Sequence, residues 1–242
     1  MMSNSIEINL WRDCAIQSKL RIYRREDGEV RPAMLIIPGG GYGSVCDSTE
    51  GAPIAHRFEE LGFQVFVLLY RVAPHCYPAP QLDAFRAIRL IRAHAQEWCA
   101  NPDELAVCGF SAGGHLAACC GTLYRDLDAK DGDEADAMSQ RPDAMVLCYP
   151  VISSCEKAHV GSFQNLLNEN FEELKDSLSL EKLVDGDTPP AFVWHTAADQ
   201  VVPYENSVLF AQAMWRNGRK CALQVYPTGP HGMQLGYYRK DI

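Results

Sequence analysis

The stretch Leu105-Ala-Val-Cys-Gly-Phe-Ser-Ala-Gly-Gly-His115 carries the strongest structural signal in the chain. It begins as a short apolar run typical of a buried strand and continues into a run of small residues that opens a helix. A Gly-x-Ser-x-Gly pattern centred on Ser111 joins the two. A serine at such a strand-to-helix turn projects its hydroxyl above the sheet, where the amino end of the helix favours developing negative charge. The stretch therefore predicts an α/β fold and a nucleophilic serine.

Short apolar runs alternate with longer amphipathic segments along the rest of the 242 residues. The pattern predicts strands over residues 20–23, 33–38, 64–70, 105–110, 144–149, 191–196 and 222–226, with the alternating segment 4–10 as a candidate edge strand. It predicts helices over residues 52–61, 81–98, 113–124 and 204–217. This order, with continuous apolar strands buried on both faces, indicates one α/β domain over residues 1–242, with a mostly parallel sheet between two helical layers.

Two segments depart from this alternation. Residues 153–189 are long for a connection, and their apolar residues indicate short helices in a small lid-like insertion. Residues 125–136 hold six acidic side chains without the ligand spacing of a calcium loop, so we expect a solvated acidic loop and no metal site. Arg86, Arg89 and Arg92 lie off the apolar stripe of the helix predicted at 81–98, which indicates a solvated face.

Two later residues complete a candidate catalytic triad with Ser111. Asp199 directly follows the strand predicted at 191–196, at the edge of the sheet where sites in such folds lie. His231 follows the last predicted strand and is the only histidine after Asp199. The order serine, acid, histidine is the order that this kind of elbow requires. We expect His231 to take the proton of Ser111 and Asp199 to orient the imidazole; a surface acid and a structural loop histidine are the alternatives.

The segment Pro38-Gly-Gly-Gly-Tyr-Gly43 follows the strand predicted at 33–38 and offers backbone N–H groups free of side chains. We expect an oxyanion hole formed by the N–H groups of Gly40, Gly41 and Ala112. A phosphate-binding loop is the alternative, but the chain lacks the Gly-Lys-Ser/Thr that such a loop requires. The side chains expected to border the substrate pocket are those of Tyr42, His75 and His159.

Composition limits the partners and the compartment. The net charge of −9, from 22 basic and 31 acidic residues, disfavours nucleic-acid binding, and no apolar run approaches the length of a membrane span. The first ten residues lack the basic and apolar regions of a signal peptide, so we expect a cytoplasmic location. The ten cysteines lack Cys-x-x-Cys spacing, which favours reduced, largely buried thiols; a cropped secreted protein with disulfides is the alternative.

Four motifs resemble the bacterial esterase/lipase α/β-hydrolases, above all the acetyl-esterase group often labelled acetyl-xylan esterase-like. They are Pro38-Gly-Gly-Gly-Tyr42, Tyr70-Arg-Val-Ala-Pro74, Gly109-Phe-Ser-Ala-Gly-Gly-His115 and His195-Thr-Ala-Ala-Asp199. The resemblance implies an α/β-hydrolase fold, the same triad and oxyanion loop, no cofactor, and hydrolysis of short acyl esters, especially acetyl groups on carbohydrate such as xylan oligosaccharides. Pro38 departs from the lipase-type His-Gly-Gly-Gly, which disfavours a lipase-like specificity. An amidase or peptidase and a non-catalytic binding module of the same fold are the alternatives.

Overall fold

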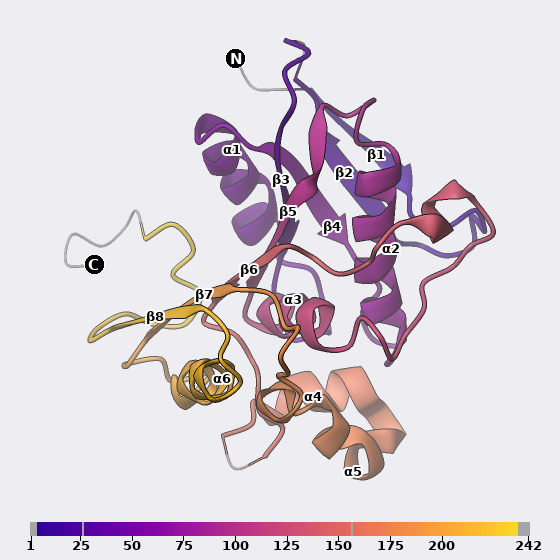
Figure 1. The fold of residues 1–242 in the computed structure, drawn as a ribbon. Helices are drawn as coiled ribbons and strands as arrows, with labels where there is room; N and C mark the ends of the chain where they lie inside the picture. Colours follow the sequence, from indigo (N-terminus) through magenta and orange to yellow (C-terminus); the bar gives the residue numbers. More distant parts are fainter. Residues whose placement is uncertain (1–3, 26, 156, 237–242) are drawn as a thin grey trace.

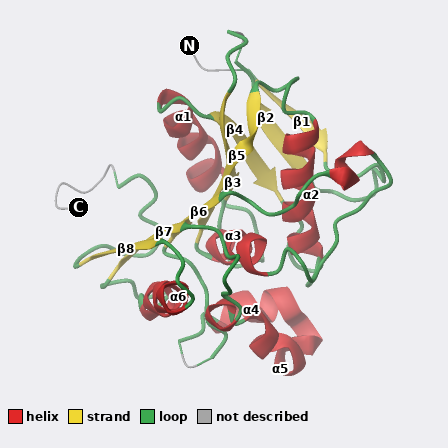
Figure 2. Cartoon of the chain, in the orientation of Figure 1, coloured by secondary structure: helices red, strands yellow, loops and turns green. Residues whose placement is uncertain are grey.

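An eight-stranded sheet forms the centre of the computed structural model, which describes residues 4–25, 27–155 and 157–236 (Figures 1 and 2). Its strand order is β1-β2-β4-β3-β5-β6-β7-β8. The strands from β3 to β8 run parallel, whereas β1 and β2 add an antiparallel edge beside β4. The strands are β1 (Ser5–Asn9), β2 (Lys19–Tyr23), β3 (Arg31–Ile37), β4 (Gln64–Leu69), β5 (Ala100–Phe110), β6 (Ala144–Cys148), β7 (Ala191–Thr196) and β8 (Cys221–Tyr226).

Helices cover both faces of this sheet. Helix α1 (Ala52–Glu60) lies on one face, and α2 (Ala79–Ala93), α3 (Ala112–Thr122) and α6 (Glu205–Arg216) lie on the other (Figure 2). Alternate residues of β3 serve the two layers: Leu35 and Ile37 join the core beneath α2 and α3, while Met34 and Ile36 join the core beneath α1. A strand buried on both faces has no polar side, as the continuous apolar runs indicate. The predicted three-layer α/β architecture is confirmed.

Most predicted element bounds differ from the observed ones by one or two residues, but two differ more. The helix predicted over 81–98 ends at Ala93, because the chain turns before the next strand and passes through Cys99 at a φ of 54°. Strand β5 then begins at Ala100, where it pairs with Arg31 of β3, rather than at Leu105. Pairing with the start of β3 extends β5 beyond its apolar run.

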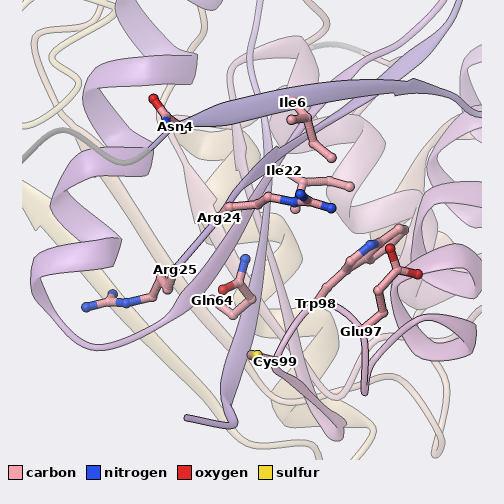
Figure 3. A pocket seen from close by; sticks show the side chains of 9 residues that line it. All are labelled: Asn4, Ile6, Ile22, Arg24, Arg25, Gln64, Glu97, Trp98 and Cys99. Atoms are coloured by element: carbon pink, nitrogen blue, oxygen red, sulfur yellow. The ribbon is translucent and has the colours of Figure 1, made fainter. Parts of the chain in front are cut away.

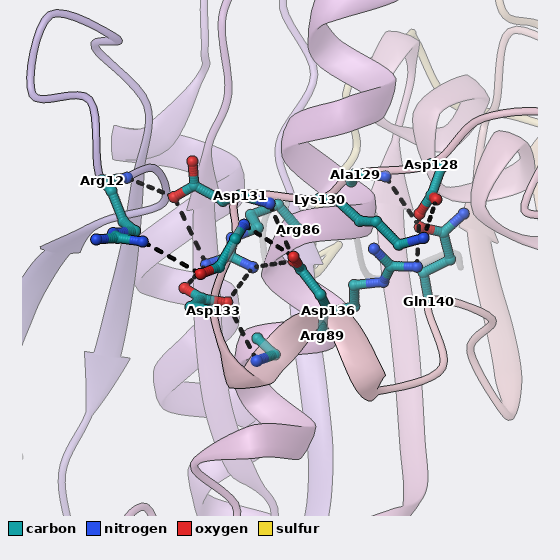
Figure 4. Close-up of polar contacts among 12 residues, drawn as sticks. Arg12, Arg86, Arg89, Asp128, Ala129, Lys130, Asp131, Asp133, Asp136 and Gln140 are labelled. Carbon is teal, nitrogen blue, oxygen red and sulfur yellow. Dashed lines mark hydrogen bonds and ion pairs between the residues drawn. The ribbon is translucent and has the colours of Figure 1, made fainter.

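The arginine face of α2 is buried, so the prediction of a solvated face is wrong (Figure 4). Only 1% of Arg86 and 7% of Arg89 is exposed. The acidic residues 125–136 fold back onto this face: Arg86 Nη1 lies 2.9 Å from Asp133 Oδ1, and Arg89 Nη2 lies 2.8 Å from Asp128 Oδ1. The acidic loop is therefore a partner of α2 rather than a freely solvated loop, because buried guanidinium groups need carboxylates to balance their charge.

The segment 153–189 forms the short helices that its apolar residues predict. They are α4 (Val160–Leu167), the 3-10 turn Asn168–Asn170, α5 (Phe171–Leu174) and the 3-10 turns Lys175–Leu178 and Leu180–Lys182. Phe163 and Leu166 of α4 are buried in the same core as α3. The segment therefore packs on the helical layer that contains the Ser111 turn.

The ten cysteines are all free thiols, and four of them are buried: Cys108, Cys119, Cys120 and Cys148. The other six are partly or fully exposed, so fewer cysteines are buried than the sequence predicts. No helix within the described part of the chain is long and apolar enough to cross a membrane.

Candidate active site

Ser111 occupies a strained turn between β5 and α3. Its φ of 54° and ψ of −119° lie in a region that side-chain-bearing residues rarely adopt. The flanking glycines make the turn possible: a Cβ on Gly109 would lie 2.1 Å from the carbonyl oxygen of Gly113, and a Cβ on Gly113 would lie 2.1 Å from that of Ile37. These contacts give the physical reason for both glycines of the Gly-x-Ser-x-Gly pattern.

The structure brings Ser111, His231 and Asp199 together from three loops at the carboxyl ends of β5, β8 and β7. His231 Nε2 lies 2.9 Å from Ser111 Oγ, and His231 Nδ1 lies 2.7 Å from Asp199 Oδ2. A carboxylate can only accept, so Nδ1 carries the proton of a neutral imidazole, and Nε2 is left to accept the hydroxyl proton of Ser111. This is the arrangement that activates a serine as a nucleophile.

Asp199 is held as an ionised carboxylate. Its Oδ1 accepts the backbone N–H groups of Val201 at 2.8 Å and Val202 at 3.0 Å. Burial alone would raise the pKa of Asp199, but hydrogen bonds from His195, His231 and Val201 outweigh burial and hold that pKa well below its usual range. The carboxylate therefore stays charged across the physiological pH range.

His195, which lies in the strand predicted over 191–196, is a second partner of Asp199. Its Nε2 lies 3.2 Å from Asp199 Oδ2 and 3.0 Å from the carbonyl oxygen of Val202. Both neighbours are acceptors, so Nε2 carries the proton and Nδ1 accepts from Ser207 Oγ at 2.8 Å. The only sequence signal for this role is the spacing of four residues between His195 and Asp199.

The glycine loop lies beside the nucleophile. A Cβ built on Gly39 would lie 3.0 Å from Ser111 Cβ, and Gly40 and Gly41 have φ values of +127° and +63° that favour glycine. Among the hydrogen bonds of the described residues, none is donated by the N–H groups of Gly40 or Gly41. Ala112 is the first residue of α3, and such N–H groups have no partner within a helix. These three N–H groups remain the candidate oxyanion donors.

Glu50 and Tyr149 border the same region and were not singled out from the sequence. Glu50 Oε2 accepts the N–H of Gly39 at 2.8 Å, and its Oε1 accepts the hydroxyl of Tyr149 at 2.8 Å. The ring of Tyr149 meets the ring of His231 edge to face, with centroids 5.0 Å apart. Both side chains are buried. Their separation by 99 positions along the chain explains why no local pattern pointed to this contact.

The three side chains expected to border the substrate pocket differ in burial and in their contacts. Tyr42 is 1% exposed and its hydroxyl lies 2.8 Å from His115 Nδ1, so its ring supports the glycine loop from the core and offers no surface to a substrate. The backbone of Tyr42 has a positive φ of 58°, and with this backbone conformation the side chain packs into the core. His75 is exposed in a turn. His159 is half-buried, its Nδ1 lies 2.8 Å from Ser162 Oγ, and burial is the main cause that lowers its pKa.

A separate cavity of about 510 Å³ lies at the opposite end of the parallel strands, near the start of β4 and β5 (Figure 3). It is bordered by the first residue of β4, Gln64, and by Trp98 and Cys99 beyond α2. Within the described residues, no group of three or more His, Cys, Asp or Glu side chains is placed to hold a metal ion.

Comparison with known proteins places the chain among esterase relatives. The BD-FAE family model matches residues 20–214. Endo-1,4-beta-xylanase B of Butyrivibrio fibrisolvens is 38% identical over 218 residues, which are 88% of this chain and 34% of that protein. Acetylxylan esterase of Xylanibacter ruminicola is 31% identical over 214 residues, 86% of this chain and 42% of that protein. The chain thus spans less than half the length of these two curated relatives.

Solved structures show the same fold. The acetyl ester-xyloside bifunctional hydrolase of Caldicellulosiruptor lactoaceticus is 39% identical with a TM-score of 0.92, over 99% of this chain and 92% of that one. The esterase Est2 of Thermogutta terrifontis is 28% identical with a TM-score of 0.80, over 96% and 84% of the two chains. The family match covers most of the sequence, and the fold agrees with that of α/β-hydrolases. The chain therefore belongs to the BD-FAE family, with an α/β-hydrolase fold and relatives of the acetyl-xylan esterase kind.

Proposed function

We propose that this chain is a serine carboxylesterase in which Ser111 is the nucleophile. The observation that carries the proposal is the continuous chain of hydrogen bonds from Ser111 Oγ through His231 to Asp199, at 2.9 and 2.7 Å. In a site that hydrolyses esters, a neutral histidine must accept the hydroxyl proton while a carboxylate fixes its tautomer. The hydrogen-bond pattern around both nitrogens of His231 meets that requirement.

The reaction follows from these positions. Ser111 Oγ forms a bond to the ester carbonyl carbon as His231 Nε2 takes its proton, and the carbonyl electrons move onto the oxygen. The N–H groups of Gly40, Gly41 and Ala112 are the proposed donors to that oxyanion. When the intermediate collapses, the alcohol leaves with the proton from His231. Water then attacks the acyl-serine by the same route, releasing the carboxylic acid and restoring the hydroxyl.

Residues 153–189 are proposed to be a fixed wall of the substrate cleft, within a single α/β-hydrolase domain over residues 1–242. Asn165 Nδ2 donates to the carbonyl oxygen of Gly41 at 2.9 Å, so α4 rests directly on the glycine loop. Farther along, the carbonyl oxygen of Leu178 lies 3.0 Å from Nε2 of the buried His115 of α3. These two contacts support a segment held in place against the glycine loop, and we propose that it favours small acyl groups over long ones.

Acetyl esters of carbohydrate are the proposed substrates. The support comes from relatives named as an acetylxylan esterase and as an acetyl ester-xyloside bifunctional hydrolase. A short acyl group also agrees with the α4 wall beside Gly41. The acyl-enzyme mechanism requires neither a metal nor an organic cofactor.

A hydrolysis panel tests this proposal. Wild type and Ser111→Ala are assayed with p-nitrophenyl acetate, butyrate and octanoate, an acetylated xylo-oligosaccharide and an aminoacyl anilide. We expect rates that fall steeply beyond acetate, acetate release from the oligosaccharide, and no activity in Ser111→Ala. A preference for octanoate or the anilide would replace the proposed substrate class, and full activity in Ser111→Ala would overturn the mechanism.

A further inference from the structure

A buried carboxylate, Glu50, connects the glycine loop with the loop that contains His231. The proposed mechanism requires these two loops to keep a fixed position relative to each other. Glu50 lies in the π-helical turn Asp47–Gly51, just before α1, and only 5% of it is exposed. In the described part of the chain, no lysine or arginine forms an ion pair with it. A buried carboxylate is costly unless hydrogen bonds and charges compensate it, so the groups around Glu50 merit a functional explanation.

The first group is the glycine loop. Glu50 Oε2 accepts the N–H of Gly39 at 2.8 Å, which fixes the Pro38–Gly39 peptide, one peptide before the one that carries the Gly40 N–H. A Cβ on Gly39 would lie 2.8 Å from Glu50 Oε2 and 3.0 Å from Ser111 Cβ, so the carboxylate, the loop and the nucleophile are packed together. The N–H of Gly40, in the next peptide, is the first donor proposed for the oxyanion, and its direction depends on how the Pro38–Gly39 peptide is held.

The second group is the histidine loop. Glu50 Oε1 accepts the hydroxyl proton of Tyr149 at 2.8 Å, and the same hydroxyl oxygen accepts the N–H of Gln234 at 3.1 Å. The ring of Tyr149 packs edge to face on the ring of His231. Tyr149 has a φ of 38°, and the backbone N–H of this residue is bonded to Trp194 of β7. The hydroxyl of Tyr149 thus joins Glu50 to the segment that follows His231.

The charges are consistent with this link. Burial raises the pKa of Glu50 above its ordinary value, and the hydrogen bonds from Gly39 and Tyr149 offset part of that rise by favouring the carboxylate. A carboxylate accepts from both groups at once, whereas a glutamine could accept from Gly39 and contact Tyr149 only by turning the hydroxyl proton away from residue 50, because one end of an amide can only donate.

We propose that Glu50 is a positioning residue that holds the glycine loop and the His231 loop in one geometry, so that the oxyanion donors and the base act on the same bond. The inference rests on the proposed esterase function. It assigns Glu50 a role in the transition state rather than in substrate binding, because the loops it joins supply groups that meet developing charge.

The test compares Glu50→Gln and Tyr149→Phe with wild type. Glu50→Gln keeps the volume but turns one accepting oxygen into a donor, and Tyr149→Phe keeps the ring against His231 but removes the hydroxyl. We expect Glu50→Gln to lower kcat on p-nitrophenyl acetate by about 10- to 100-fold with KM within about twofold, since misaligned oxyanion donors act mainly on the transition state. Tyr149→Phe should lower kcat by about three- to tenfold. Glu60→Gln is the control, because Glu60 is an exposed glutamate paired with Arg57 on α1.

A second measurement separates positioning from general damage. A trifluoromethyl ketone that forms a tetrahedral adduct with serine should lose affinity in Glu50→Gln by the same factor as kcat/KM, while KM is unchanged. Thermal unfolding identifies variants that do not fold, in which case Tyr149→Phe, with Glu50 retained, decides the question. Wild-type kcat in a folded Glu50→Gln or Tyr149→Phe, or a change in KM alone, would overturn the proposal. Activity of wild type and its loss in Ser111→Ala test the proposed function separately.

Discussion

Replacing Asp199 with asparagine is expected to trap His231 in an inactive tautomer without changing the shape of the site. Asp199 Oδ1 accepts two backbone N–H groups, from Val201 and Val202, so the oxygen of the new amide must occupy that position. The amide nitrogen then faces His231 Nδ1, where the carboxylate oxygen lies at 2.7 Å in the native chain. Nδ1 must now accept, and the imidazole proton moves to Nε2.

A proton on Nε2 leaves no lone pair for the hydroxyl proton of Ser111, 2.9 Å away. Rotating the amide does not rescue the site, because its nitrogen would then oppose the two backbone N–H groups. The amide nitrogen also opposes Nε2–H of His195, which lies 3.2 Å from Asp199 Oδ2 in the native chain. Loss of the correct tautomer lowers kcat by about 10⁴-fold, which equals about 5 kcal/mol of transition-state stabilisation.

Steady-state hydrolysis of p-nitrophenyl acetate measures this effect. The matched control is Asp185→Asn, because Asp185 is a half-exposed aspartate whose partner, Arg125, is also half-exposed. The control should keep kcat within about twofold, since exposed ion pairs contribute little. Circular dichroism verifies that both variants fold. A folded Asp199→Asn with kcat within about tenfold of wild type would refute the tautomer argument.

Gly113→Ala is expected to prevent folding, because its Cβ would meet a β3 carbonyl oxygen at 2.1 Å, whereas Gly186→Ala has open space and should keep the wild-type Tm. Arg86→Met should lower the free energy of unfolding in urea by about 3 kcal/mol, since it leaves the carboxylates of residues 125–136 without their buried partner; a loss below about 1 kcal/mol would contradict that reasoning. The pKa of Asp199 is lower in the folded chain than its usual 3.8, so its stabilisation is present above about pH 4 and is lost as the pH falls below that value. Asp199→Asn should therefore flatten the acid decline of the unfolding free energy, measured by urea titration from about pH 5 to about pH 2, and an unchanged decline would argue against an ionised Asp199.

The parts of the fold and site that the sequence predicts are those encoded by local patterns. The strands are continuous apolar runs, and Ser111, Asp199 and His231 each follow one of them, so the common direction of parallel strands brings their loops to one edge. The turn at Ser111 is recognisable because Gly109 and Gly113 stand where a Cβ would collide with backbone.

The features that the sequence does not predict depend on tertiary packing. Arg86 is buried only because residues 125–136 return to α2, which hydropathy along the helix cannot register. Tyr42 turns into the core because its backbone adopts a positive φ, and Glu50 meets Tyr149 from a distant part of the chain. In each case, the environment of one side chain is set by a contact between two segments that are far apart in the sequence, and no local sequence pattern encodes that contact.

Labelling with a fluorophosphonate tests the central claim most directly, because it reports the activated serine without assuming a substrate. The folded protein is treated with the probe, digested, and read by peptide mass spectrometry beside Ser111→Ala and His231→Ala. The account predicts stoichiometric modification of Ser111 in wild type, none at that position in Ser111→Ala, and a strongly slowed reaction in His231→Ala. An unmodified Ser111 in folded wild type, or labelling that is equally fast in His231→Ala, would contradict it.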